Sequence, residues 1–227
     1  MKPGWTRRVV TVCGGVAFTV VVFGFSFQPL LLPAYTASLV ITVDAPARTG
    51  LPPEQAQALA EDVRAFVAGA RGVELPGQLP DGRPAFEPDA VEHLVDVREV
   101  VAAGRAVAWM ALLLGCAWAA WCLLGPVERR DLLARSLRGA ALAVAATVAI
   151  AALAAVADFD TFFARFHDVF FEPGTWTFPA DALLIRLFPE SFWVASGIWW
   201  GGLSLLGAAL LAVCARLVVR YRSERTT

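Results

Sequence analysis

Four long apolar runs, interrupted by few charges, dominate the pattern of hydrophobic and polar positions along the chain. They cover residues 9–32, 106–124, 137–156 and 193–219. An α-helix needs about 20 mostly apolar residues to cross a bilayer, so the pattern predicts four membrane-spanning helices. The first run is long and has no small-residue cleavage site after it, which favours a retained span, with a removed signal peptide as the alternative.

The segment between the first two spans carries shorter patterns. Apolar residues recur at helical spacing in the stretch 52–70, which predicts an amphipathic helix. Residues 71–86 are rich in proline and glycine and predict a loop, whereas the stretch 35–52 has weak alternation and several helix breakers, so we expect a connector there. Asp89 is expected to cap a further helix that runs towards the second span.

The segment between the last two spans is unusually aromatic. Its phenylalanines recur at helical spacing around a single histidine in residues 159–171, which predicts a short helix after the third span. Residues 180–188 predict an amphipathic turn bounded by prolines. Thirteen of the 25 aromatic residues lie between Phe159 and Trp200, and aromatic rings collect at the headgroup level of a bilayer.

Together these patterns predict an all-α integral membrane protein with four transmembrane helices. We expect a single membrane domain over residues 1–227, with outer loops at 33–105 and 157–192 that carry short amphipathic helices, and an inner loop at 125–136. Composition agrees with this class, because 58% of the residues are hydrophobic and only 17% are charged, well below the roughly 25% of soluble domains.

Charge distribution predicts the orientation in the membrane. The N-terminus, the 125–136 loop and the C-terminal tail together hold 11 positive charges against three acids, whereas the two outer loops hold 8 arginines against 17 acids. The 11 positive residues are Lys2, Arg7, Arg8, Arg129, Arg130, Arg135, Arg138, Arg216, Arg220, Arg222 and Arg225. Because positive charges near the spans stay in the cytoplasm, we expect both termini inside and both outer loops outside. No basic patch indicates a nucleic-acid partner.

The chain has two histidines, and both fall in the outer loops beside carboxylates. His93 and Asp96 are three residues apart on the helix that leads to the second span, so they share a face. A carboxylate within reach of an imidazole can orient it and support acid–base work. His167 lies among phenylalanines, where charging an imidazole is costly, so its pKa should fall and the ring should be a neutral proton acceptor.

Several motifs resemble a known family. The segments "EHLVDV" (Glu92–Val97) and "FHDVFF" (Phe166–Phe171), followed by Trp176, "PADALLI" and "LFPESF", occur in a frame of four spans. This arrangement is similar to the bacterial integral membrane family that includes the lipoprotein intramolecular transacylase Lit. The resemblance covers nearly the whole chain, and the histidine blocks are its specific part.

The resemblance implies a membrane acyltransferase with an outward-facing site at His93 and His167. It implies transfer of an acyl chain from the glycerol of a diacylglyceryl-cysteine lipoprotein to the α-amino group of the cysteine, which leaves a lyso-form lipoprotein and uses no cofactor or metal. We expect His167 as the general base and His93, oriented by Asp96, as the donor to the oxyanion or leaving oxygen, and these roles are interchangeable on the sequence alone. The expected supporting residues are Asp96, Glu92, Asp168 and Trp176, with membrane lipid around the site.

Two other classes of function remain open on the sequence. In a metal-dependent membrane hydrolase, the two histidines would bind a divalent metal together with nearby acids. The candidate acids are Glu92, Asp96, Asp160 and Asp168. In a non-enzymatic membrane scaffold, the histidines would be dispensable. A transporter is disfavoured, because no span carries a charge at its middle.

Overall fold

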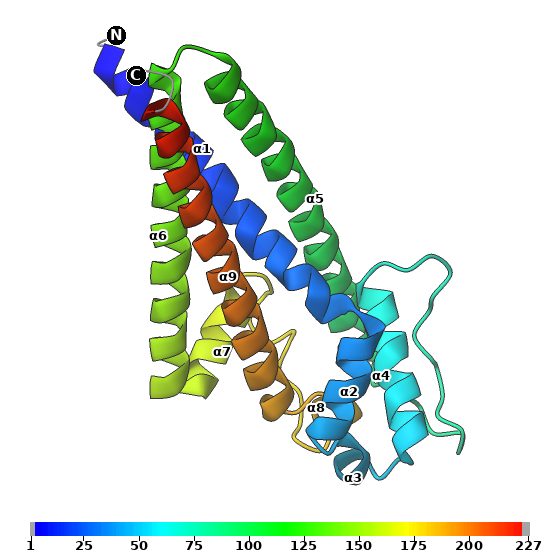
Figure 1. Ribbon diagram of the computed structural model, residues 1–227. Coiled ribbons are helices and arrows are strands. Elements are labelled where there is room, and N and C mark those ends of the chain that lie inside the picture. Colours follow the sequence, from blue (N-terminus) through cyan, green and yellow to red (C-terminus); the bar gives the residue numbers. More distant parts are fainter. Residues whose placement is uncertain (1–2, 224–227) are drawn as a thin grey trace. The chain divides into compact units, whose positions relative to one another are not determined.

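A computed structural model of the protein describes residues 3–223 and consists of helices joined by turns and loops of varied length (Figure 1). The helices in chain order are α1 (Pro3–Phe27), the 3-10 helix η1 (Gln28–Leu31), α2 (Pro33–Thr42), α3 (Ala45–Thr49), α4 (Pro53–Val67), α5 (Pro88–Leu124), α6 (Glu128–Ala157), α7 (Phe159–Asp168), α8 (Leu183–Leu187) and α9 (Glu190–Ser223). Three residues of the charge count, Lys2, Glu224 and Arg225, lie outside the described residues.

Four of these helices are long and apolar enough to cross a membrane. They cover Gly4–Leu31, Pro88–Leu124, Glu128–Ala157 and Glu190–Arg220. This confirms the prediction of an all-α, multi-pass membrane protein. Within residues 3–223 the only β-type pairing is an isolated bridge between Gln78 and Pro84, inside the segment 71–86 that was predicted as a loop.

The chain divides into two compact units, each built from separate stretches of sequence. Unit 1 comprises Met1–Ser26, Arg105–Val156 and Trp200–Thr227. Unit 2 comprises Phe27–Gly104 and Ala157–Trp199. The expectation of a single membrane domain stays a prediction, and each unit is described by itself.

Unit 1 is held by close helix contacts at small residues. Gly24 of α1 lies so close to Ala108 of α5 that a side chain at Gly24 would overlap the alanine methyl group. The Ser136 hydroxyl of α6 donates to the Thr11 carbonyl of α1 at 2.8 Å, and it accepts from the Trp118 indole of α5 at 3.2 Å. Small residues let helix backbones approach in this way inside membranes, where apolar burial gives little drive for association.

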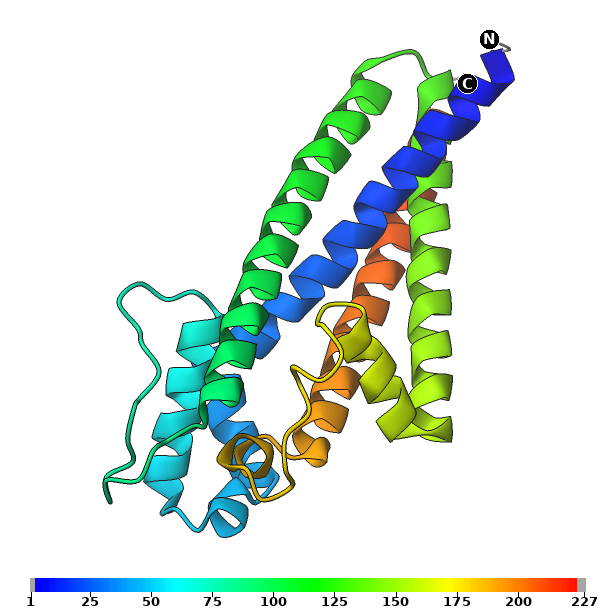
Figure 2. The same ribbon diagram turned by 180° about the vertical axis from the view of Figure 1, so that it is seen from behind.

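The inner loop expected at residues 125–136 is much shorter in the structure. Only residues 125–127 connect the helices, because α6 already begins at Glu128. Its first turn holds Glu128 and Asp131, and acids in the first turn favour a helix by complementing its dipole. The charges that suggested a loop therefore belong to the start of α6. Figures 1 and 2 show that the last turns of α9 lie at the same end of unit 1 as the start of α6.

Unit 2 has an apolar core of the kind found in soluble domains. The predicted amphipathic helix is confirmed as α4, and its apolar positions are buried: Ala56, Leu59, Ala60, Val63 and Phe66. The predicted short helix and proline-bounded turn are confirmed as α7 and α8. The core also takes in Leu187 and Phe188 from α8 and the residue that follows it, and Leu79 and Phe86 from the 71–86 loop.

The connector expected at residues 35–52 is wrong, since this stretch contains most of α2 and all of α3. Its β-branched residues weaken intrinsic helix propensity, which tertiary packing overrides. α2 packs along α4 (Figures 1 and 2), with Val40 fully buried. Two side chains of α4 also bind the α2 region, because Gln57 donates to the Ala37 carbonyl at 3.1 Å and Arg64 donates to the Leu31 carbonyl at 2.8 Å.

The prediction that Asp89 caps the next helix is also wrong, because the helix starts one residue earlier. α5 begins at Pro88, so Asp89 lies inside its first turn, where its carboxylate accepts from the Ala90 N–H at 2.8 Å. Proline suits the first helical position because its φ angle is preset and no N–H is missed there. From Pro88, α5 continues without a break into the second span.

Candidate active site

His93 enters the interior of unit 2 from the second turn of α5. The side chain is 8% exposed, and the neighbouring positions Ala90 and Leu94 are buried on the same side of the helix. Residues three and four apart share a helix face. The His93 imidazole therefore lies on the buried face of α5, together with the apolar side chains of that face.

His167 stands near the end of α7, and its ring orientation is set by a hydrogen bond. Asp158 caps the start of α7, and its carboxylate accepts from the Thr161 N–H at 3.0 Å. One turn before the histidine, the Phe163 carbonyl lies 2.8 Å from His167 Nδ1. A carbonyl oxygen can only accept, so Nδ1 carries the hydrogen and, in the neutral ring, Nε2 keeps the free lone pair.

The two imidazoles meet inside unit 2. Their ring centroids are 6.2 Å apart, with an angle of 33° between the planes. One ring comes from α5 and the other from α7, two elements far apart in the sequence. Their meeting creates a pair of titratable rings at one place.

Aromatic side chains surround the two rings and form a cage of low polarity. Phe171 presents its edge to His93 at 4.9 Å and lies 5.7 Å from His167. Phe178 lies 5.6 Å from His93. On the other side, His167 contacts Trp176 at 4.8 Å and Phe163 at 4.1 Å, all measured between ring centroids.

The surroundings shift the titration of His167. Burial lowers its pKa below the ordinary value of 6.5, while the Phe163 carbonyl and the Asp168 carboxylate act in the opposite direction. The direction agrees with the expectation from the sequence. Below its usual range, a histidine is neutral at neutral pH and is available as a proton acceptor.

Two buried nitrogens beside the ring pair have unused hydrogen-bonding capacity. His93 Nδ1 and Trp176 Nε1 are inaccessible and have no hydrogen-bond partner within the described part of the chain. Buried polar atoms without a partner are rare in folded proteins and call for an explanation. Here they accompany the only two histidines of the chain.

The acidic residues expected to support the site lie around it. Asp96 and Glu92 are exposed on α5, and among residues 3–223 no hydrogen bond or ion pair joins Asp96 to His93. Asp168 is exposed as well and faces Arg165 at 3.7 Å. Of the expected residues, the structure therefore brings together His93, His167 and Trp176, and leaves the carboxylates at the periphery.

Two features of the site were missed by sequence reasoning. Phe178 comes from an irregular stretch between α7 and α8, where no periodicity indicates a direction for the side chain. The Phe163 carbonyl, in contrast, precedes His167 by four residues on a predicted helix. Its position could have been found, because a side chain near a helix end can bond a carbonyl of the preceding turn.

The donor set for a metal ion is small. The described residues contain no group of three or more histidine, cysteine, aspartate or glutamate side chains placed to hold an ion. The ring pair therefore offers two imidazoles, with the remaining surroundings supplied by aromatic rings.

Comparison with known proteins gives a family and a fold. The family model described as "Lipoprotein intramolecular transacylase Lit" matches residues 13–193. No curated protein compared with the chain matches it.

Solved structures of the membrane-integral lipoprotein intramolecular transacylase Lit from Bacillus cereus are similar over nearly the whole chain. One has 14% identity and a TM-score of 0.82, covering 99% of this chain and 100% of that one. A histidine-to-arginine variant has 14% identity and a TM-score of 0.77, covering 98% and 96%. A histidine-to-alanine variant has 15% identity and a TM-score of 0.72, covering 99% and 97%.

At these identities the likeness to the solved structures establishes the fold, while the family model spans well over half of the sequence, a range that includes both histidine blocks. The resemblance inferred from the motifs is thus confirmed. The chain belongs to the lipoprotein intramolecular transacylase Lit family.

Proposed function

We propose that this protein is an intramolecular transacylase of diacylglyceryl lipoproteins. It moves an acyl chain from the glycerol of the N-terminal diacylglyceryl-cysteine to the α-amino group of the same cysteine. Family membership supports the reaction class. The observation that carries the assignment to residues is the His93–His167 pair in its aromatic cage.

His167 acts as the general base through Nε2. Its Nδ1 is occupied by the Phe163 carbonyl at 2.8 Å, which leaves the opposite nitrogen as the proton acceptor. The lowered pKa keeps this ring neutral at neutral pH. A positioned base of this kind contributes about 10²–10⁴-fold to rate.

The protons balance in two steps. The α-ammonium group loses one proton to solvent as the free amine forms. The amine nitrogen then attacks the ester carbonyl, His167 takes its second proton, and that proton passes to the glycerol oxygen as the ester C–O bond breaks. The products are an amide on the cysteine nitrogen and a free hydroxyl on the glycerol.

His93 stabilises the oxyanion of the tetrahedral intermediate. A neutral imidazole carries one N–H donor, and donors aimed at developing charge in a dry site are strongly stabilising. The ring is 8% exposed and surrounded by Phe171 and Phe178, so water competes little. Trp176 Nε1, a buried donor without a partner, is a second group that can serve this charge.

The reaction itself makes a small catalytic site sufficient. The nucleophile and the ester belong to one molecule, so holding them in contact removes much of the entropic barrier. No side-chain nucleophile and no cofactor are needed. Glu92, Asp96 and Asp168 then serve as peripheral charges, and the aromatic cage with the surrounding membrane lipid accommodates the acyl chains.

The proposed orientation places both termini in the cytoplasm of a bacterial cell and the histidines outside. The asymmetry of 11 positive charges on one set of segments against 17 acids on the other supports it. A reporter fused to the C-terminus should be active only in the cytoplasm, and one inserted at Gly82 only outside.

Purified protein in lipid vesicles, mixed with a synthetic diacylglyceryl-cysteine peptide, tests the proposal. Acyl migration conserves the mass of the peptide but blocks its α-amine, so an amine-reactive label should stop reacting while the mass of the unlabelled peptide stays unchanged. Release of fatty acid with a free amine would instead indicate a hydrolase. Loss of that activity in EDTA and its return with zinc would indicate a metal-dependent hydrolase, with His93 and His167 as the candidate ligands.

A further inference from the structure

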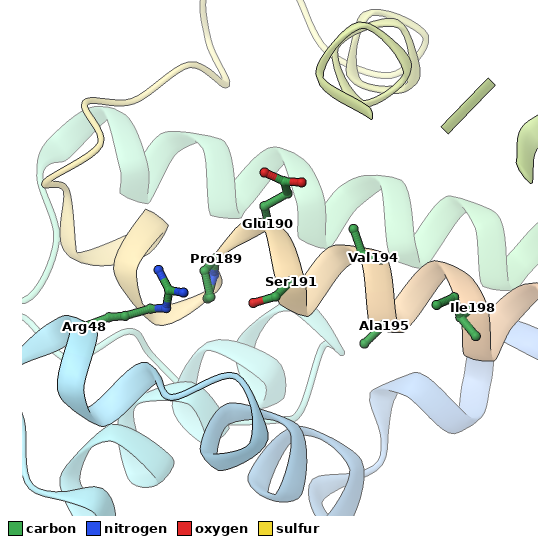
Figure 3. A pocket seen from close by; sticks show the side chains of 7 residues that line it. All are labelled: Arg48, Pro189, Glu190, Ser191, Val194, Ala195 and Ile198. Atoms are coloured by element: carbon green, nitrogen blue, oxygen red, sulfur yellow. The ribbon is translucent and has the colours of Figure 1, made fainter. Parts of the chain in front are cut away.

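A pocket of about 500 Å³ opens at the start of α9, within unit 2 (Figure 3). Its polar end is lined by Arg48 of α3 and by Glu190 and Ser191 of α9. Its apolar end is lined by Val194, Ala195 and Ile198. Neither histidine contributes to it.

The pocket lies on one face of α9, whereas the aromatic residues beside His167 contact α9 through Trp193. Ser191, Val194, Ala195 and Ile198 are spaced by three, four and seven residues, so they form one stripe along the helix. Trp193 does not line the pocket, and its ring centroid lies 6.1 Å from that of Phe163, the residue that contacts His167. The pocket is therefore separate from the site of the proposed acyl transfer.

The polar end holds a cation and an anion that do not neutralise each other. Arg48 uses Nε to donate to the Val43 carbonyl at 3.3 Å, and no ion pair joins it to Glu190 within residues 3–223. In Figure 3 the Glu190 carboxylate points away from Arg48, and the Ser191 hydroxyl lies on the arginine side of the pocket. Opposite charges at separate points of one pocket suit a ligand that is itself zwitterionic.

The apolar end continues along a surface suited to lipid. Ile198 is 71% exposed, and it belongs to the candidate span Glu190–Arg220. The span begins at Glu190, so the polar end of the pocket stands at the start of the apolar segment and the apolar end runs along it. A headgroup and an acyl chain have this same order of polar and apolar parts.

We infer that this pocket binds a phospholipid with a phosphoethanolamine headgroup. The Arg48 guanidinium binds the phosphate, because its planar set of N–H donors matches two phosphate oxygens. The Glu190 carboxylate takes the ammonium group, Ser191 adds a hydrogen bond, and one acyl chain follows the stripe from Val194 to Ile198. A phosphoglycerol headgroup would leave Glu190 without a cation, and a phosphocholine headgroup has no N–H to donate.

Lipid retention by the purified, delipidated protein tests this inference. The protein is titrated with phosphatidylethanolamine, phosphatidylglycerol or phosphatidylcholine of the same acyl chains, and bound lipid is counted by native mass spectrometry. We expect phosphatidylethanolamine to be retained about tenfold more strongly than the other two, the scale of a lost charged hydrogen bond. Arg48→Gln and Glu190→Gln should each weaken its retention by about the same factor.

Two exposed residues of unit 2 outside the pocket provide matched controls. Arg71→Gln and Glu87→Gln remove the same charges and should leave retention unchanged. Glu190→Lys should move the preference to phosphatidylglycerol, because the pocket would then hold two cations, and it tests the site independently of any loss of fold in Arg48→Gln. Equal retention of the three lipids, or unchanged retention in the pocket variants, would overturn the inference. Displacement of the phospholipid by a diacylglyceryl-cysteine peptide would also overturn it, because the pocket would then belong to the substrate.

Discussion

The two units of this protein differ in where their large apolar side chains lie. In unit 1, large apolar side chains such as Leu142 and Leu153 are exposed, and helices approach at small residues such as Gly24. In unit 2, large apolar side chains such as Leu187 form a buried core. Unit 1 also buries apolar side chains around Val144, so the units differ in how much large apolar surface they leave exposed. The exposed apolar side chains of unit 1 belong to candidate spans and suit contact with lipid, where helices associate through close packing.

The units also differ in their polar groups. The buried Ser136 hydroxyl of unit 1 both donates and accepts hydrogen bonds between helices. In unit 2 the buried nitrogens of His93 and Trp176 have no partner in the described chain. The Ser136 hydroxyl thus serves helix association, although the Ser204 hydroxyl of unit 1 is also buried without a hydrogen-bond partner in the described chain. The nitrogens of the candidate site in unit 2 remain available for a reaction.

The largest expected effect comes from the two histidines. His93→Ala and His167→Ala should each lower the transacylation rate by about 10²–10⁴-fold. The double variant should be little worse than either single variant, because groups that act as one unit are not additive. The rate is measured as loss of amine labelling of the diacylglyceryl peptide, with Leu153→Ala of unit 1 as a control that keeps its rate. Multiplicative losses in the double variant would contradict a shared site.

The next largest effect is on the free energy of unfolding, and it compares a buried leucine of unit 2 with an exposed leucine of unit 1. Leu187→Ala removes a side chain that is 0% exposed and should cost about 2–5 kcal/mol of unfolding free energy. Leu153→Ala changes a side chain that is 72% exposed and should stay within about 0.5 kcal/mol. Denaturant unfolding in detergent micelles measures both values. Similar losses in the two variants would break the distinction between the units.

A smaller loss is expected from overfilling a helix contact in unit 1. Gly24→Leu must displace Ala108 of the neighbouring helix, and overpacking of this kind costs about 1–3 kcal/mol. Gly139→Leu is the matched control, because a Cβ added there meets no other group within 4 Å. The difference in midpoint between the two variants measures the contact, and equal midpoints would show that α1 and α5 need no close approach.

The smallest effect is a shift in the pH profile. Both the substrate amine and His167 must be unprotonated, so log rate should rise with pH at unit slope below the amine pKa of about 8 and more steeply below the pKa of His167. Asp168 raises that histidine pKa against the larger effect of burial. Asp168→Asn should therefore move the steep limb to lower pH.

Asp160→Asn provides the control for this shift, because it removes an acid of the same helix that does not act on His167. The rates of both variants are measured from acid to neutral pH, at one peptide concentration below saturation. The pH at which the steep limb of each profile begins is then compared. A shift to higher pH in Asp168→Asn, or an equal shift in both variants, would contradict the base role of His167.

Local patterns in the sequence were sufficient for the membrane class and for several helices. Hydropathy acts residue by residue against lipid or water, so four apolar runs specify spans without knowledge of their neighbours. The apolar stripe of α4 was likewise readable, because helical spacing alone determines which side chains share a face. For the same reason, phenylalanines at helical spacing indicated α7.

Tertiary packing decided the rest. Residues 35–52 form helices because α2 buries Val40 against α4, a contact that no local pattern contains. The three-residue spacing of His93 and Asp96 allowed a shared face, but the boundary between buried and exposed surface falls between them. The ring pair itself arises only when α5 and α7 meet, since the free energy of that contact depends on groups distant in the sequence.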